Sequence, residues 1–263
     1  MSQVTSRQSP ELIVALDVDT LEKAKHFVGI LYPTVKLFKV GSQLFTAYGP
    51  EAVKMVVKEG AKVFLDLKFH DIPHTVSSTV ASGTSLSCEP VFVSTISSNI
   101  EEDVRQNTQP AVFMMTVHTM GGEEMLKAAV SGATEKAAEL KIIKPFIVGV
   151  TRLTSDENSK NTLQAVLEAA KLAKNSGLDG VVCSVNEAAA VRSECGKDFI
   201  IVTPGIRPRG YNKDDQARVA TEQEAIEAGA DFLVVGRPIL DAKDPVLATK
   251  IILESMQKAK GLN

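Results

Sequence analysis

Eight short apolar runs recur along the chain, and this repetition limits the folds that are open to it. Each run is almost continuously apolar, which is typical of strands that are covered on both faces in a parallel sheet. Amphipathic helical patterns separate most of the runs; the clearest, at residues 161–176, is followed by Gly177, a residue suited to a left-handed helix stop. The expected strands are residues 12–16, 35–40, 62–67, 111–117, 145–150, 180–185, 199–203 and 231–235.

The alternation of strands and helices predicts a (β/α)8 barrel. Eight strands in 263 residues fit this fold, whereas a doubly wound open sheet more often has about five or six strands. Similar helix-to-strand loops at residues 59–62, 176–179 and 228–231 indicate that one αβ connection is reused. No shift in composition divides the chain, so we expect residues 1–263 to form a single domain with a polar N-terminal tail at 1–10.

Residues 77–110 interrupt this rhythm. The segment is rich in Ser and Thr, contains Pro90 and Pro110, and carries an isolated β-like run at residues 91–96. We interpret it as an insertion between the third and fourth βα units of the barrel. It forms either an extra strand or hairpin or an irregular surface excursion, and the sequence does not distinguish between the two.

Charge and composition exclude several classes of function. The net charge is −3 and basic residues are spread over the whole length, which leaves no basic patch for nucleic acid or an anionic membrane. No apolar run approaches the roughly 18 residues of a membrane helix. The three cysteines, Cys88, Cys183 and Cys195, form no CxxC pair and indicate a reducing compartment. We therefore expect a cytoplasmic protein with neither a nucleic-acid nor a membrane partner.

Charged side chains gather where the strands are expected to end, which in a barrel is where catalytic groups lie. Asp66 and Lys68 are two residues apart in the third run and share a strand face, Asp71 follows past the turn, and Lys39 ends the second run. Charges inside an apolar strand persist only when they are paired or functional. These four residues predict an alternating chain of opposite charges. A structural ion pair that closes the end of the barrel is the alternative.

Two Gly-Arg loops follow the last two runs, one with Gly205 and Arg207 and the other with Gly236 and Arg237. Many barrels bind phosphate at this position, where glycine exposes backbone N–H groups and a guanidinium contacts the phosphate oxygens. The pair predicts a phosphorylated substrate. In the alternative interpretation, the glycines are simple turn residues and the arginines are solvated.

Three histidines lie near the same end of the barrel. His70 and His74 have the i, i+4 spacing of two metal ligands on a helix, but Pro73 between them makes a helix through both doubtful. We favour loop histidines there over a metal site. For His118, which precedes two glycines, we favour a packed side chain over a hydrogen-bonding group at the rim.

Several motifs together resemble those of the orotidine 5′-phosphate decarboxylase family, in the same order and at the ends of nearly all the expected strands. The resemblance extends from about Leu12 to the C-terminal helix. The Asp-x-Lys-x-x-Asp core alone is less specific, because related sugar-phosphate decarboxylases and hexulose-phosphate synthases share it. The motifs are LDVD with Asp17, FKVG with Lys39, DLKFHDIP at 66–73, VHTMGG at 117–122, TRLTS at 151–155, VTPGIRP at 202–208, DDQARVAT at 214–221 and VVGRPI at 234–239.

This resemblance implies an activity: decarboxylation of orotidine 5′-phosphate to uridine 5′-phosphate and CO2, the last step of UMP biosynthesis, without a metal or other cofactor. It implies that Lys39, Asp66, Lys68 and Asp71 form the catalytic network and that Lys68 is the proton donor. It also implies a homodimer, in which Asp71 and Thr75 reach across the interface into the partner's site.

The family pattern further implies the substrate contacts. Asp17 and Lys39 match contacts to the ribose hydroxyls, and Thr154 matches a pyrimidine contact. The remaining matches surround the phosphate and the closing loop at residues 207–218; they are Arg207, Gln216, Gly236 and Arg237.

Two departures from the family pattern and three competing functions stay open. His74 stands where the family usually has Asn, and the connection between residues 76 and 111 is longer than usual. The main alternative is a Mg2+-dependent sugar-phosphate decarboxylase of the same group, although the Lys39 ammonium stands where a Mg2+ site would need a carboxylate. An aldolase with Lys68 as a Schiff-base nucleophile and a phosphate-ligand-binding barrel without turnover are the others.

Overall fold

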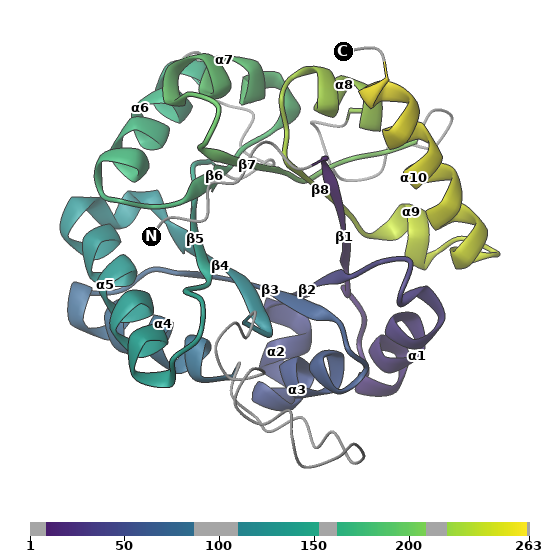
Figure 1. The fold of residues 1–263 in the computed structure, drawn as a ribbon, viewed down its shortest axis with the longest axis horizontal. Coiled ribbons are helices and arrows are strands. Elements are labelled where there is room, and N and C mark those ends of the chain that lie inside the picture. Colours follow the sequence, from purple (N-terminus) through teal and green to yellow (C-terminus); the bar gives the residue numbers. More distant parts are fainter. Residues whose placement is uncertain (1–8, 87–109, 153–161, 209–219, 262–263) are drawn as a thin grey trace, which may run out of the picture.

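The computed structural model describes residues 9–86, 110–152, 162–208 and 220–261, and it shows a closed barrel of eight parallel strands (Figure 1). Strands that are consecutive in the chain are neighbours in the barrel, and pairing of the last strand with the first closes the ring. The predicted (β/α)8 fold is confirmed. The strands are β1 (Glu11–Ala15), β2 (Leu37–Gly41), β3 (Lys62–Phe69), β4 (Val112–His118), β5 (Phe146–Val150), β6 (Gly180–Val182), β7 (Ile200–Thr203) and β8 (Phe232–Val235).

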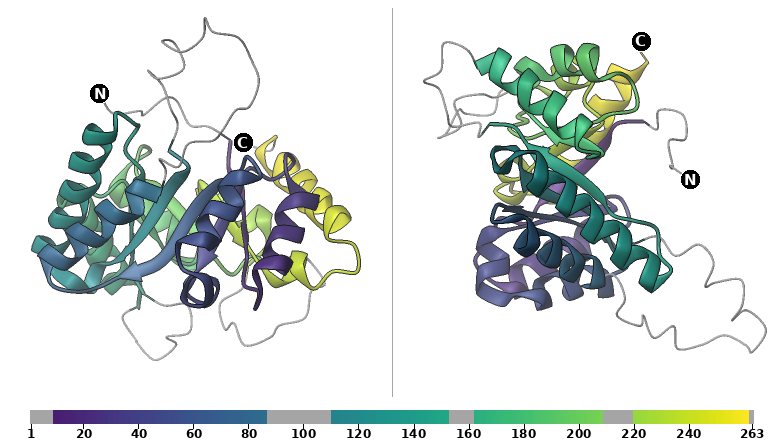
Figure 2. Two further views of the ribbon diagram at one scale, coloured as in Figure 1. Left: turned by 90° about the horizontal axis from the view of Figure 1, so that it is seen from below. Right: turned by 90° about the vertical axis from the view of Figure 1, so that its left-hand side faces the viewer.

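Helices form the outer layer and surround the strands on all sides (Figures 1 and 2). They are α1 (Leu21–Leu31), α2 (Ser42–Tyr48), α3 (Pro50–Lys58), α4 (Pro73–Ser85), α5 (Gly122–Leu140), α6 (Thr162–Asn175), α7 (Val185–Cys195), α8 (Glu222–Glu227), α9 (Arg237–Leu240) and α10 (Pro245–Lys260), with a 3-10 turn, η3 (Thr119–Gly121), before α5. Side-chain caps fix where helices begin: Thr20 accepts a hydrogen bond from the N–H of Lys23 in α1, and Asp244 caps α10 in the same way. In the described ranges, no helix is both long and apolar enough to cross a membrane.

The apolar runs are buried on both faces, as their composition predicts. Along β1, Ile13 and Ala15 point into the barrel, whereas Val14 packs in the layer between strands and helices. Near the starts of the strands, the ring of Phe113 meets the edges of two other phenylalanine rings, at centroid distances of 5.2 and 5.8 Å. Aromatic packing therefore fills the N-terminal end of the barrel and leaves its carboxyl end for a cavity.

Two of the repeated αβ loops share a specific hydrogen bond. Gly177 and Gly229 end their helices with φ near +85° and +89°, a conformation that glycine adopts without strain. Two residues later, Asp179 accepts a hydrogen bond from the N–H of Ile147 at the start of β5 (2.7 Å), and Asp231 makes the equivalent bond at the start of β7 (2.8 Å). Each aspartate ties its own loop to the preceding strand, which confirms that this connection is reused.

Residues 77–85, which we expected to belong to an insertion, are instead part of a helix. Helix α4 runs to Ser85 and is the regular helix of the third βα unit, packed closely against α5. Its Ser and Thr content masked the helix in the sequence, but Val76 and Val80 bury one face, and hydroxyls such as that of Thr84 bond to the carbonyl four residues earlier. The rest of the segment, with the β-like run at 91–96, lies outside the described residues.

Candidate active site

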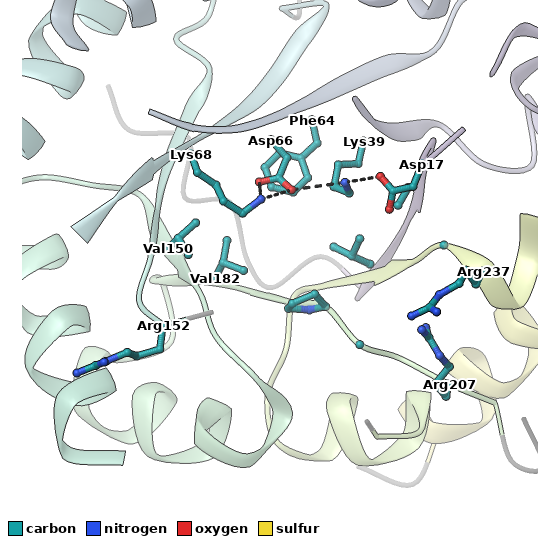
Figure 3. A pocket seen from close by; sticks show the side chains of 15 residues that line it. Asp17, Lys39, Phe64, Asp66, Lys68, Val150, Arg152, Val182, Arg207 and Arg237 are labelled. Atoms are coloured by element: carbon teal, nitrogen blue, oxygen red, sulfur yellow. Dashed lines mark hydrogen bonds and ion pairs between the residues drawn. The ribbon is translucent and has the colours of Figure 1, made fainter. Parts of the chain in front are cut away.

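A cavity of about 470 Å³ opens at the carboxyl ends of the strands (Figure 3). Its floor is apolar and its wall carries both signs of charge, with two lysines and two aspartates on one side and two arginines on the other. Such a mixture suits a ligand that is partly aromatic and partly anionic. The lining residues are Ala15, Asp17, Lys39, Phe64, Asp66, Lys68, Val150, Arg152, Val182, Pro204, Gly205, Arg207, Val234, Gly236 and Arg237.

Four charged side chains form a row of alternating sign across three strand ends (Figure 3). Lys68 Nζ lies 2.9 Å from both carboxylate oxygens of Asp66. Lys39 Nζ lies between two carboxylates, 3.5 Å from Asp66 and 3.0 Å from Asp17. Lys39, Asp66 and Lys68 alternate as the sequence predicted, and Asp17 extends the row beyond Lys39. Asp71, which we expected next to Lys68, is not part of the row in the single chain.

The row stabilises its own ionised state. Burial raises the pKa of the Asp66 carboxyl, but the charges of Lys39 and Lys68 outweigh burial and bring that pKa below its ordinary value. Burial likewise lowers the pKa of Lys39, and the neighbouring Asp66 and Asp17 carboxylates more than compensate, so the net shift is upward. Both groups are therefore charged at neutral pH.

The backbone of β3 is irregular where it presents these charges. Leu65 pairs with Met115 of β4, and the next paired residue of β3 is Phe69, opposite Val117, so the ladder is interrupted between them. Lys68 lies in this bulge with φ of +53°, a left-handed conformation that is rare for a residue other than glycine. Asp66 and Lys68 reach the same cavity, as predicted, through a bulge and not by simple strand alternation.

Gly41 leaves room for the ammonium group of Lys39. A Cβ atom at position 41 would lie 2.8 Å from Lys39 Nζ and 3.3 Å from an oxygen of Asp17. Any larger residue would have to displace this ion pair. The glycine of the FKVG motif therefore has a steric role that its sequence position did not reveal.

Arg207 and Arg237 face each other across the end of the cavity that is farther from Lys68 (Figure 3). Arg207 is buried, and its backbone N–H donates to the carbonyl of Ala220 (2.9 Å), which joins the loop after β7 to the segment that leads into α8. Arg237 is the first residue of α9 and follows Gly236 directly. The predicted pairing of the two Gly-Arg loops is thus observed, and two guanidinium groups at one point suit a dianionic ligand.

The other predicted site residues lie away from the cavity or outside the described residues. Asp71 follows β3 with an exposed side chain, and its carboxylate accepts a hydrogen bond from the N–H of Ile72 (2.6 Å). Thr75, in the first turn of α4, is also exposed. Thr154 and Gln216 lie outside the described residues, so their predicted substrate contacts stay predictions.

Two of the histidines at the rim, His70 and His118, form a stacked pair. The rings of His70 and His118 are stacked at a centroid distance of 5.6 Å, while His74 lies in α4 beyond Pro73. His118 is half-buried, and its Nδ1 accepts a hydrogen bond from the N–H of Met120, so the packed interpretation is confirmed only in part. Burial lowers the pKa of His118, with smaller effects from His70 and Lys68. Within the described ranges, no three potential ligands gather to hold a metal ion.

Three parts of the site were not predicted. Thr116 is fully buried in β4, and its hydroxyl contacts both Asp66 and the backbone of Lys68. Arg152 follows β5 at the cavity edge, with its guanidinium directed away from the cavity (Figure 3). The apolar floor, which includes Phe64 and Val182, consists of ordinary strand residues. Thr116 and the floor residues have no sequence signal beyond their place in an apolar run, whereas Arg152 lies in the TRLTS motif but had no predicted role.

Comparisons with known proteins agree with this geometry. Residues 10–252 match the model of the orotidine 5′-phosphate decarboxylase / HUMPS family. An orotidine 5′-phosphate decarboxylase of Syntrophotalea carbinolica is 42% identical over 95% of this chain and 96% of its own, and one of Moorella thermoacetica is 40% identical over 95% and 93%. The crystal structure of the Lactobacillus acidophilus orotidine 5′-phosphate decarboxylase superimposes with a TM-score of 0.71 at 32% identity, covering 94% of this chain and 99% of that one. The chain belongs to the orotidine 5′-phosphate decarboxylase / HUMPS family.

Proposed function

We propose that this protein decarboxylates orotidine 5′-phosphate to uridine 5′-phosphate and CO2, the last step of UMP biosynthesis, without a cofactor. One observation carries the proposal: a lysine ammonium held by a buried carboxylate lies at one end of a cavity that has two arginines at its other end. A phosphorylated substrate that develops a carbanion needs cationic groups for the phosphate at one end of the cavity and a cation beside the carbanion at the other. We place the enzyme in the cytoplasm, where thiols such as the free, buried Cys183 and Cys195 remain reduced.

Lys68 supplies a positive charge and a proton. The bond between C6 of the pyrimidine and the carboxyl carbon breaks, CO2 leaves, and the electron pair stays on C6, where no attached group delocalises it. Lys68 Nζ then gives a proton to C6, and water reprotonates the lysine. At about 4 Å and an effective dielectric constant of about 20, one charge contributes roughly 4 kcal/mol, so other interactions must also favour the transition state.

Asp66 and the phosphate-binding end supply further contributions. The carboxylate of Asp66 disfavours the substrate carboxylate next to it and is relieved as CO2 leaves. Asp17 and Lys39, at the other end of the row, contact the ribose hydroxyls. Arg207 and Arg237 bind the phosphate, and its binding energy keeps the substrate in the charged, water-poor part of the cavity. Following the family pattern, Thr154 contacts the pyrimidine, and Gln216 and Gly236 complete the phosphate site.

A spectrophotometric assay tests the proposed reaction. Orotate and uracil rings absorb differently, so consumption of orotidine 5′-phosphate by the purified protein is followed directly. We expect turnover that is unchanged after incubation with a chelator. Absence of turnover would contradict the proposal and leave a ligand-binding barrel, whereas loss of activity with chelator would favour the Mg2+-dependent alternative, in which carboxylates should surround the cation.

We also propose that the enzyme is a homodimer in which Asp71 and Thr75 complete the partner's site. All residues from Asp71 to Thr75 are exposed in the single chain, and the large apolar side chain of Ile72, between β3 and α4, is 66% exposed. A partner that covered this segment would bury the Ile72 side chain, which the single chain leaves exposed to solvent. The same strand end holds Lys68, so a two-fold contact there brings each Asp71 near the other chain's site.

Subunit complementation tests this arrangement. Lys68→Ala and Asp71→Ala proteins are each expected to be nearly inactive. In a mixed dimer, one site lacks both side chains and the other is intact, so a fully exchanged equal mixture should regain about a quarter of the wild-type activity. Steady-state turnover after exchange, with mass spectrometry to count mixed dimers, measures the effect.

The control mixture pairs Lys68→Ala with Asp66→Asn. Because Lys68 and Asp66 of one chain contact each other directly, each mixed dimer then has one defect in each site, and no activity should return. Recovery in this control, or no recovery with Asp71→Ala despite proven exchange, would show that Asp71 does not act across an interface.

A further inference from the structure

We propose that Thr116 is a positioning residue for the reaction, whose hydroxyl fixes Asp66 and Lys68 relative to each other. The inference rests on the proposed decarboxylation, and it extends that function to a residue of the neighbouring strand that does not line the cavity. Thr116 lies in β4, directly opposite the irregular part of β3, and its side chain is fully buried.

The β-bulge leaves the backbone of Lys68 without a regular ladder partner. Between the pairs Leu65–Met115 and Phe69–Val117, three residues of β3 lie opposite a single residue of β4, which is Thr116. The N–H of Lys68 donates to Thr116 Oγ1 at 2.8 Å, so the hydroxyl takes the place of a backbone carbonyl. This side chain therefore completes the pairing of the two strands at the bulge.

The conformation of Lys68 needs such support. A φ of +53° is unfavourable for a residue with a Cβ atom and persists only where the surroundings determine it. The hydrogen bond from the Lys68 N–H is one contact that holds the backbone in this conformation. The direction of the Lys68 side chain, and with it the position of Nζ, depends on that backbone.

The same hydroxyl also contacts Asp66. Thr116 Oγ1 lies 3.1 Å from Asp66 Oδ1, and this oxygen accepts a hydrogen bond from Lys68 Nζ at 2.9 Å. Because a backbone N–H can only donate and an ionised carboxylate can only accept, the hydroxyl hydrogen must point to Asp66. The four groups form a closed ring that runs from the Lys68 N–H through the hydroxyl and carboxylate to the Lys68 ammonium.

A matched pair of variants tests this role. Thr116→Ser and Thr116→Ala both remove the γ-methyl group and differ only in the hydroxyl. We expect Thr116→Ser to keep kcat within about threefold of wild type and Thr116→Ala to lower kcat roughly tenfold, the effect of about one net hydrogen bond. The KM for orotidine 5′-phosphate should change little in either, because the arginines lie at the far end of the cavity. Thr116→Val, which preserves volume, should behave like Thr116→Ala.

A pH profile separates positioning from a merely structural effect. Asp66 faces Lys39 from β2, Lys68 from its own strand and Thr116 from β4, and each of these contacts lowers the pKa of its carboxyl. Loss of the hydroxyl should move the acidic limb of kcat to higher pH in Thr116→Ala and Thr116→Val but not in Thr116→Ser. NMR titration of the Asp66 carboxyl carbon should show the same shift without turnover, which separates this inference from the proposed reaction.

Thr84 provides the control for stability. It is a fully buried threonine in α4 whose hydroxyl donates to the carbonyl of Val80, and it does not line the cavity. Thr84→Val should lower the melting temperature without changing kcat or the pH profile. Equal kcat in Thr116→Ser and Thr116→Ala, or an unshifted Asp66 titration in the latter, would overturn the proposed role of Thr116.

Discussion

Replacing Lys68 with alanine is expected to reduce decarboxylation by at least roughly 10⁴-fold while leaving the barrel folded. The variant loses both the cation nearest the developing carbanion and the proton that C6 receives, and each is a large effect in enzymes. Folding should survive because Asp66 keeps two partners, Lys39 Nζ at 3.5 Å and the Thr116 hydroxyl at 3.1 Å. The carboxylate is therefore not left as an unpaired buried charge.

Lys62 supplies a matched control for this variant. It lies at the start of the same strand, where its ammonium group is 5.2 Å from the centre of the Phe113 ring at the opposite end of the barrel. Lys62→Ala should retain nearly full turnover. Single-turnover assays and circular dichroism of both variants measure activity and folding together. Substantial turnover by a folded Lys68→Ala protein would show that another group donates the proton.

The fold could be predicted because its main determinants are local. Nearly continuous apolar runs report strands that are buried on both faces, and residues such as Ile13 and Val14 show this directly by packing on opposite sides of β1. Residues 77–85 were wrongly assigned to the insertion because the main determinant of helix α4 is not local. The serines and threonines of α4 have weak helix propensity, and their helix is stabilised by packing against α5, which the sequence does not display.

The site could be predicted as far as charge and strand order determine it. Lys39, Asp66 and Lys68 are charged residues at the ends of adjacent strands, so the barrel brings them together. Asp71 follows Lys68 closely in sequence, but the chain has already left the strand there. Thr116 was missed because a threonine in an apolar run is ordinary, and its role depends on a bulge in the neighbouring strand.

The bulge itself leaves no sequence signature. Asp66 and Lys68 are two residues apart, and a regular strand would also place both on one face. The spacing of the two charges is therefore compatible with a regular strand and with a bulged one. Only the structure shows the bulge and the left-handed conformation of Lys68. That difference matters for the mechanism, because the position of the Lys68 ammonium group then depends on β4 as well as on β3.

Arg237→Ala should lower kcat/KM for orotidine 5′-phosphate by roughly 100-fold. Arg237 and Arg207 converge on one end of the cavity, and loss of a charge-assisted hydrogen bond to a phosphate costs about 3 kcal/mol. Phosphate binding far from C6 helps to hold the pyrimidine beside Lys68, so the loss should appear in the transition state as well as in the bound substrate. Arg237→Lys should be intermediate, because an ammonium keeps the charge but not the paired donors.

A substrate without the phosphate makes this prediction specific. Orotidine should be a poor substrate for the wild type, and because it cannot contact Arg237 through a phosphate, the Arg237→Ala substitution should change its kcat/KM by less than about threefold. The two substrates and two proteins form a cycle whose interaction term measures the contact between guanidinium and phosphate. An equal loss with both substrates would mean that Arg237 supports the fold of the loop after β8, and near-normal kcat/KM with orotidine 5′-phosphate would remove Arg237 from the phosphate site. A large interaction term would instead show that phosphate binding by Arg237 at one end of the cavity contributes to stabilising the transition state beside Lys68 at the other end.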